Sequence, residues 1–202
     1  RADPARCERL HYVSIEKHPF ERDALKTLHQ RYAEFTPLAE QLRNAWPPLV
    51  AGLHRLHFEA DRLTLTLAFG DALELVPELR LTADAIYLDG FAPRCNPEMW
   101  SPQLMRGLAR IARPGTTVAT YSCAGAVREG LEAAGFTLEK YPGFGRKRDM
   151  LRGSFAPRWP PRRARAAPPD RTDRHAMVIG AGLAGAAISE RLEELKIGPN
   201  PI

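Results

Sequence analysis

Asp84-Ala-Ile-Tyr-Leu-Asp-Gly-Phe-Ala-Pro-Arg-Cys-Asn-Pro-Glu-Met-Trp100 is the stretch that decides the fold. Its mostly apolar residues 85–88 predict a buried parallel strand, and Asp89 follows at the carboxyl end of that strand. Gly90 and the two prolines after it disfavour both helix and sheet. Open α/β sheets bind their ligands at the carboxyl ends of strands. The stretch therefore predicts a ligand site at Asp89, and its two aromatic residues suggest a base or an amine as substrate.

Strand and helix patterns alternate on both sides of this stretch. The strands are predicted at residues 10–15, 54–58, 63–69, 85–88, 116–121, 136–141 and 149–155. The helices are predicted at residues 20–32, 37–46, 72–79, 98–112 and 123–134. This alternation predicts a parallel α/β sheet, in which the last two strands form an antiparallel pair at one edge.

The composition is that of an ordinary globular protein. The 202 residues are 44% hydrophobic and 26% charged, and no apolar run approaches the ~20 residues of a membrane span. The three cysteines and six histidines are scattered, so we expect no metal site and a reduced, cytoplasmic protein. A net charge of +5 fits a polyanionic partner such as nucleic acid.

The composition changes near residue 156 and again near residue 175. Residues 156–174 hold five prolines and six arginines, which predicts a linker after a first domain at residues 1–155. The segment 175–202 begins with a strand, a glycine-rich turn and a helix pattern. Such a turn binds a dinucleotide, with glycines for the tight turn, the approach of a pyrophosphate and close helix packing, here Gly180, Gly182 and Gly185.

Three acidic residues follow consecutive predicted strands, namely Glu16, Asp71 and Asp89. In a nucleoside-binding α/β fold, a carboxylate after one strand accepts both ribose hydroxyls, and a carboxylate after the next accepts from an adenine amino group. Each is also explained as a plain strand-end or helix-cap carboxylate. Asp71 in particular is a candidate for the cap of the helix that follows it.

Several motifs together resemble one family. They are Ile15-Glu-Lys17, Phe69-Gly-Asp71, Asp89-Gly-Phe-Ala-Pro93, Arg113-Pro-Gly115 and Gly143-Phe-Gly-Arg-Lys-Arg148. They resemble the bifunctional tRNA 5-methylaminomethyl-2-thiouridine biosynthesis proteins (MnmC), from about residue 8 to 192. The resemblance implies two activities on a tRNA wobble uridine. An FAD-dependent domain removes a carboxymethyl group, and an S-adenosylmethionine-dependent domain then methylates the exposed amine.

The resemblance also implies roles for particular residues. Asp89 would orient the amine and accept its proton, because only a neutral amine attacks a methyl group. The residues implied for S-adenosylmethionine are Glu16, Lys17, Asp71 and Asp89, and those for FAD are Gly180, Gly182 and Gly185. Phe91 and Trp100 would form walls around the uridine, while tRNA phosphates would meet Arg146, Lys147 and Arg148. That basic triplet is explained equally well as a solvated loop.

The chain also departs from the family pattern. A methyltransferase sheet of this kind begins with a strand and a glycine-rich cofactor loop, whereas this chain begins at the expected second strand. The missing strand would lie between the strands at residues 10–15 and 85–88. The fold class is therefore a Rossmann-like S-adenosylmethionine methyltransferase sheet lacking its first strand, plus the opening β-turn-α of an FAD-binding Rossmann domain. We expect a monomeric fragment, truncated at both ends, that binds S-adenosylmethionine weakly or not at all.

Two other functions are compatible with these residues. One is methylation of a different amine, and the other is tRNA binding without catalysis, which the missing cofactor loop would permit. A flavin oxidoreductase alone is excluded, because only about 18 residues match that fold, far fewer than a domain needs.

Overall fold

The computed structural model describes residues 7–143, 145, 147–158 and 174–179. The strands are β1 (Leu10–Glu16), β2 (Gly52–Phe58), β3 (Leu63–Phe69), β4 (Ala83–Leu88), β5 (Ala112–Thr120), β6 (Phe136–Pro142), β7 (Asp149–Phe155) and β8 (Arg174–Ile179). The helices are α1 (Arg22–His29), α2 (Thr36–Ala45), α3 (Ala72–Glu78), α4 (Pro102–Ile111) and α5 (Gly125–Ala133), with 3-10 turns η1 (Ala33–Phe35) and η2 (Pro97–Trp100).

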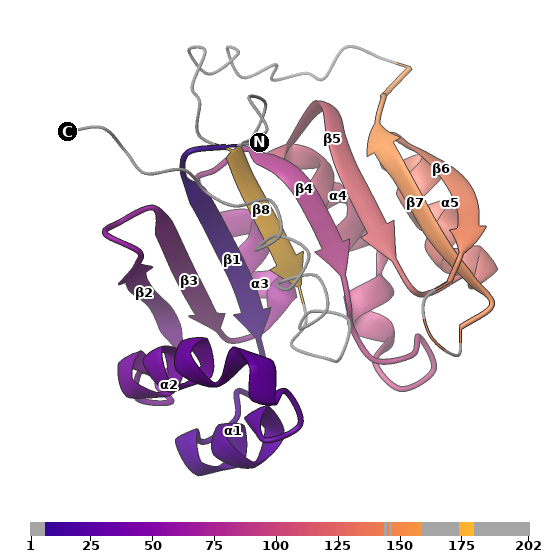
Figure 1. Ribbon diagram of the computed structural model, residues 1–202. Helices are drawn as coiled ribbons and strands as arrows, with labels where there is room; N and C mark the ends of the chain where they lie inside the picture. Colours follow the sequence, from indigo (N-terminus) through magenta and orange to yellow (C-terminus); the bar gives the residue numbers. More distant parts are fainter. Residues whose placement is uncertain (1–6, 144, 146, 159–173, 180–202) are drawn as a thin grey trace, which may run out of the picture.

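The described strands form one sheet in the order β2-β3-β1-β8-β4-β5-β7-β6 (Figure 1). The five central strands from β3 to β5 are parallel to one another. Strand β2 joins one side antiparallel to β3, while β7 pairs antiparallel with both β5 and β6 on the other side. The predicted α/β sheet and its antiparallel edge pair are confirmed.

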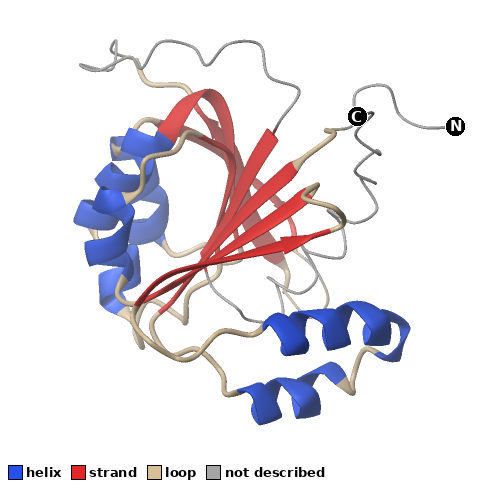
Figure 2. Ribbon diagram, turned by 90° about the vertical axis from the view of Figure 1, so that its left-hand side faces the viewer, coloured by secondary structure: helices blue, strands red, loops and turns tan. Residues whose placement is uncertain are grey.

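Helices α3, α4 and α5 cover one face of the sheet, as Figure 2 shows. The core between them holds side chains from three parallel strands, including Ile15, Ile86 and Val118, against Leu104 and Leu131 of the helices. Helices α1 and α2 pack on each other and project past the carboxyl ends of β1 and β3 (Figure 1). The carboxyl edge of the parallel strands is therefore bordered by these two helices.

The predicted helix at residues 98–112 is wrong in detail, because the structure divides it into η2 and α4. The side chain of Ser101 accepts from the amide of Leu104 at 3.3 Å and Pro102 occupies the first turn, so a new helix begins there. The strand predicted at residues 116–121 begins earlier, because β5 already starts at Ala112. The Thr116 hydroxyl accepts from the amide of Arg113 and donates to the carbonyl of Ala83, which stabilises an irregular start of that strand.

Strand β8 occupies the interior sheet position between β1 and β4. It pairs in parallel with β1 on one side and with β4 on the other. Residues 175–179, which are predicted to begin a second domain, pair within the same sheet as the strands of the first. The physical reason is that an interior gap would leave the backbone donors and acceptors of β1 and β4 unpaired, and β8 pairs them. The domain division at residue 175 stays a prediction.

Candidate functional site

The three predicted carboxylates lie at the carboxyl edge of the parallel strands. Glu16 ends β1, Asp71 follows β3 after one glycine, and Asp89 follows β4. The amide of Gly70 donates to the carbonyl of Glu16 at 2.9 Å, which joins the first two positions. Because β8 lies between β1 and β4, with Ile179 in register with the residues before Glu16 and Asp89, these two acids flank its end.

Glu16 carries the most perturbed carboxyl group of this edge. Burial is the main cause that raises its pKa from 4.5 to about 7, and the charge of Asp89 adds to the rise. The hydroxyl of Ser14, itself buried, donates to Glu16 Oε1 at 3.5 Å and partly offsets these effects. A carboxyl group with a pKa near 7 is present in both protonation states at neutral pH, so it both accepts and donates hydrogen bonds.

The carboxylate of Asp71 already binds two groups of the protein. Its Oδ1 accepts from the amide of Leu73 at 2.8 Å, so it caps α3, and its Oδ2 forms a 2.8 Å ion pair with Lys17. The hydrogen bond from Lys17 is the main cause that lowers the pKa of Asp71, and the same bond raises the pKa of Lys17. The helix-cap explanation of Asp71 is confirmed, while its role toward an adenine stays a prediction.

The segment after Asp89 is held by two aromatic side chains. The hydroxyl of Tyr121 donates to the carbonyl of Gly90 at 2.5 Å, and Trp100 Nε1 donates to the carbonyl of Phe91 at 2.8 Å. The two predicted wall residues differ in exposure, because Trp100 is 7% exposed and Phe91 is 76% exposed. Trp100 therefore supports the backbone, and the ring of Phe91 is the one that solvent reaches.

The basic segment before β7 approaches the same edge through Lys147, whose Nζ lies 5.0 Å from the centre of the Tyr121 ring. Lys147 and Arg148 are both exposed, and the carbonyl of Arg148 accepts from the amide of Gly143 at 3.0 Å. Arg146 lies outside the described residues, as do the three glycines predicted for FAD, Gly180, Gly182 and Gly185.

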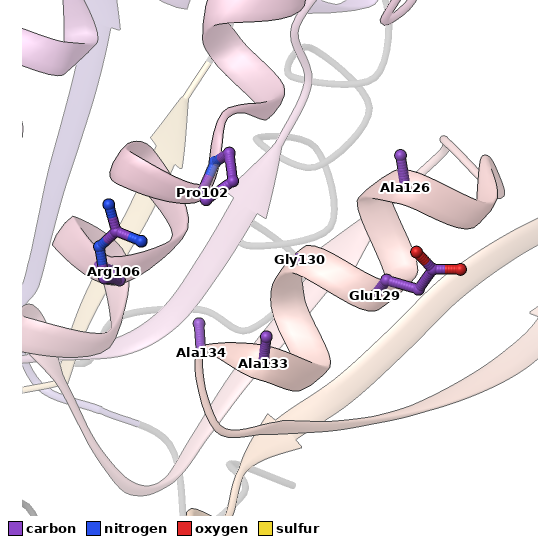
Figure 3. A pocket seen from close by; sticks show the side chains of 7 residues that line it. All are labelled: Pro102, Arg106, Ala126, Glu129, Gly130, Ala133 and Ala134. Atoms are coloured by element: carbon purple, nitrogen blue, oxygen red, sulfur yellow. The ribbon is translucent and has the colours of Figure 1, made fainter.

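Cavities of different size lie at the predicted site and away from it. One of about 40 Å³ lies between the start of α3 and the turn η2, lined in part by Lys17, Asp71 and Met99. This volume is large enough for a water molecule and too small for a nucleoside. Another, of about 420 Å³, lies between α4 and α5 where small side chains such as Ala126 and Ala133 leave space (Figure 3). None of the predicted site residues lines it.

The described ranges contain no group of three metal-ligating side chains. No helix within them is long and apolar enough to cross a membrane.

Tyr121 was missed by the sequence reasoning. It directly follows β5, the parallel strand next to β4, and so occupies a position equivalent to that of Asp89. The signal was present, because an aromatic residue at the carboxyl end of a parallel strand points to the ligand-binding edge. The strand predicted at residues 116–121 includes Tyr121 as its last residue and gives it no role in the site.

Comparison with known proteins gives a consistent family assignment. A family model described as "S-adenosyl-L-methionine-dependent methyltransferase" matches residues 33–156. The chain is 55% identical over 192 residues to the tRNA 5-methylaminomethyl-2-thiouridine biosynthesis bifunctional protein MnmC of Ralstonia nicotianae, covering 95% of this chain and 29% of that protein. It is 57% identical over 197 residues to the protein of the same name from Cupriavidus metallidurans, with the same coverage. The chain thus spans less than a third of these relatives.

A solved structure supports the fold. The crystal structure of MNMC2 from Aquifex aeolicus superimposes with a TM-score of 0.55 at 22% identity, covering 77% of this chain and 56% of that one. The likeness confirms the α/β architecture of the described sheet.

Proposed function

Because this chain belongs to the S-adenosyl-L-methionine-dependent methyltransferase family, we propose that it carries the methyl-transfer site of a tRNA-modifying enzyme of the MnmC type. The proposed acceptor is the amine of 5-aminomethyl-2-thiouridine at the wobble position, which becomes 5-methylaminomethyl-2-thiouridine. The observation that carries the proposal is the position of Asp89. It follows an interior parallel strand, and the exposed ring of Phe91 lies two residues further on.

The carboxyl groups at this edge suit the hydroxyl and amino groups of S-adenosylmethionine. The half-buried, weakly hydrogen-bonded Glu16 is available to ribose hydroxyls, and Asp71 keeps acceptor capacity beyond its cap and its ion pair for an adenine amino group. Lys17 offsets the charge of Asp71, which limits repulsion among the three acids. Bound S-adenosylmethionine would supply an electrophilic methyl group, and these residues would hold and orient it.

Asp89 acts on the acceptor in this proposal. An alkylamine is mostly protonated at neutral pH, and the protonated form has no lone pair with which to attack. The Asp89 carboxylate accepts the amine proton and orients the lone pair for in-line displacement, in which most of the rate comes from positioning. Phe91 offers its exposed face for stacking on the uridine, and Lys147 and Arg148 are exposed for tRNA phosphates.

The resemblance to the MnmC proteins also suggests how the amine substrate is produced. FAD-dependent removal of a carboxymethyl group would produce the amine, and a domain that includes Gly180, Gly182 and Gly185 would bind that FAD. Trp100 would support, through its bond to the carbonyl of Phe91, the loop that faces the uridine, and Arg146 would add a further phosphate contact. The protein would act as a monomer in the cytoplasm.

A substrate panel tests the proposal. Methyl incorporation from S-adenosylmethionine is measured with the complete gene product on three acceptors: tRNA carrying 5-aminomethyl-2-thiouridine, the same tRNA without the aminomethyl group, and free alkylamines. We expect incorporation only into the first. Equal kcat/KM on free amines would show a methyltransferase of another amine. Salt-dependent tRNA binding without methyl transfer would show a binding module.

A further inference from the structure

The Asp89 segment, Trp100 and the basic segment before β7 all meet at one side chain, that of Tyr121. Its hydroxyl donates to the carbonyl of Gly90, and its ring meets the ring of Trp100 edge to face at 87°, with 6.2 Å between ring centroids. The ammonium group of Lys147 lies over its face at 5.0 Å. Two parts of the stretch 84–100 and one residue of the basic segment therefore contact one side chain at the end of β5.

Each contact constrains the segment that follows Asp89. The carbonyl of Gly90 belongs to the second peptide group after Asp89, so a hydrogen bond to it restricts the backbone that carries this carboxylate. Trp100 holds the next carbonyl, that of Phe91, and Tyr121 packs against the edge of Trp100. A side chain added at Gly90 would meet Met99 at 3.3 Å, so the backbone lies close to η2 as well. The loop after Asp89 is therefore hydrogen-bonded at two consecutive carbonyls, those of Gly90 and Phe91.

The face of the Tyr121 ring provides the second link. A cation over an aromatic face is attracted by its quadrupole, by about 0.5–1 kcal/mol at exposed sites. Lys147 is exposed and is one of the cations proposed to meet tRNA phosphate. Burial and then the charge of Asp89 raise the pKa of Tyr121, so its hydroxyl stays protonated and remains a donor through the neutral range.

We propose that Tyr121 is a positioning residue for methyl transfer, which fixes the Asp89–Phe91 segment through its hydroxyl and connects that segment to the phosphate-contacting Lys147 through its ring. The inference rests on the proposed function. In this role Tyr121 acts through the backbone that follows Asp89 and not through a bond to the methyl donor or the amine.

The substitution Tyr121→Phe separates the two parts of the inference, because it removes the hydroxyl and keeps the ring. In the complete gene product we expect kcat for methyl transfer to fall about tenfold, the effect of one lost hydrogen bond, while KM for tRNA stays within about twofold. Tyr141→Phe is the matched control, because Tyr141 also lies under a cation, Arg152, but on β6 away from Asp89. The control should keep the wild-type kcat.

A double-mutant cycle tests whether the ring of Tyr121 positions Lys147. Lys147→Met should raise KM for tRNA in the wild type and in Tyr121→Phe by the same factor. In a Tyr121→Leu background, which has no ring to place the cation, it should raise KM less. Equal effects in all three backgrounds would contradict the link between the ring and Lys147.

Hydrogen–deuterium exchange gives a readout that does not depend on activity. In Tyr121→Phe, exchange over residues 89–92 should speed about tenfold while β5 and α4 keep their protection. Wild-type exchange and wild-type kcat in Tyr121→Phe, or the same changes in Tyr141→Phe, would overturn the inference. If the wild type transfers no methyl group but exchange rises as expected, the proposed function fails and the positioning of the loop stands.

Discussion

At the scale of single residues, the site combines carboxyl groups in three different environments. Glu16 is half-buried beside a weak donor, Asp71 pairs with a cation and caps α3, and Asp89 lies at the start of a loop whose backbone is hydrogen-bonded to Tyr121 and Trp100. Residue type and order were enough to predict that the three would share an edge, because carboxyl ends of parallel strands coincide. Their environments depend on partners distant in the chain, and so they could not be predicted.

Glu16 predicts an unusual dependence of stability on pH. Its folded-state pKa of about 7 exceeds the ordinary 4.5, so between these values the folded state holds the proton more tightly than the unfolded chain. The free energy of unfolding must therefore fall as the pH rises through this window. Glu16→Gln should remove that fall and be more stable than the wild type at pH 8, by on the order of 1–3 kcal/mol.

Urea denaturation at pH 4.5 and pH 8 measures this effect. Glu139→Gln, which changes an exposed carboxyl group on β6, is the control and should match the wild type in its pH dependence. A Glu16→Gln variant that is less stable than the wild type at pH 8 would show that burial does not penalise the charged form of Glu16.

At the scale of elements, the strands between residues 10 and 155 were predicted well, because buried strands are apolar and bounded by turn residues. The predictions failed where tertiary partners decided the boundary. Thr116 draws residues 112–115 into β5 through its bond to Ala83, a contact between distant segments. Likewise, residues 174–179 have the pattern of a Rossmann strand, but that pattern does not say which sheet such a strand joins.

The cap of α3 distinguishes two roles of Asp71. Asp71→Ala should lower the free energy of unfolding by about 1 kcal/mol, because the amide of Leu73 loses its acceptor. Asp71→Asn should keep most of the stability, because asparagine caps helices as well as aspartate does. Thermal unfolding of both variants checks this. Equal losses would mean that the ion pair with Lys17, and not the cap, stabilises this turn.

Strand β8 makes a prediction of its own. The position of Val178 in the sheet is in register with Ser14 of β1 and Tyr87 of β4, so the backbone at this residue lies between two strands. Val178→Pro removes a backbone donor there and should lower the free energy of unfolding by roughly 1–3 kcal/mol. Ala166→Pro, in the proline-rich segment, is the control. Identical urea midpoints for both variants would show that β8 does not contribute to the sheet.

At the scale of the whole molecule, the fold supplies a sheet edge with acidic residues for the proposed cofactor and a basic segment for a polyanion. The net charge of +5 alone did not locate that segment. The contact between Lys147 and Tyr121 does, because it ties one of the cations to the edge that carries Asp89.

The proposed tRNA contact should depend on salt. Binding of tRNA should weaken linearly in log[salt], and Lys147→Gln and Arg148→Gln should each reduce the magnitude of that slope by about 0.7–0.9. Arg55→Gln, an exposed cation on β2 at the opposite side of the sheet, should leave the slope unchanged. Filter binding across a salt series measures all three. If the magnitude of the salt slope falls only with Arg55→Gln, the tRNA binds at the β2 edge of the sheet and not at the β6–β7 edge.

The most direct test of the central claim is the rate of methyl transfer from S-adenosylmethionine to tRNA carrying 5-aminomethyl-2-thiouridine, in single-turnover measurements with wild type and Asp89→Asn. Asparagine keeps the size of the side chain and loses the proton acceptor. We predict a fall of about 10²–10⁴-fold with tRNA affinity unchanged, and partial recovery at high pH, where the amine is already neutral. A wild-type rate in Asp89→Asn at neutral pH would contradict the account.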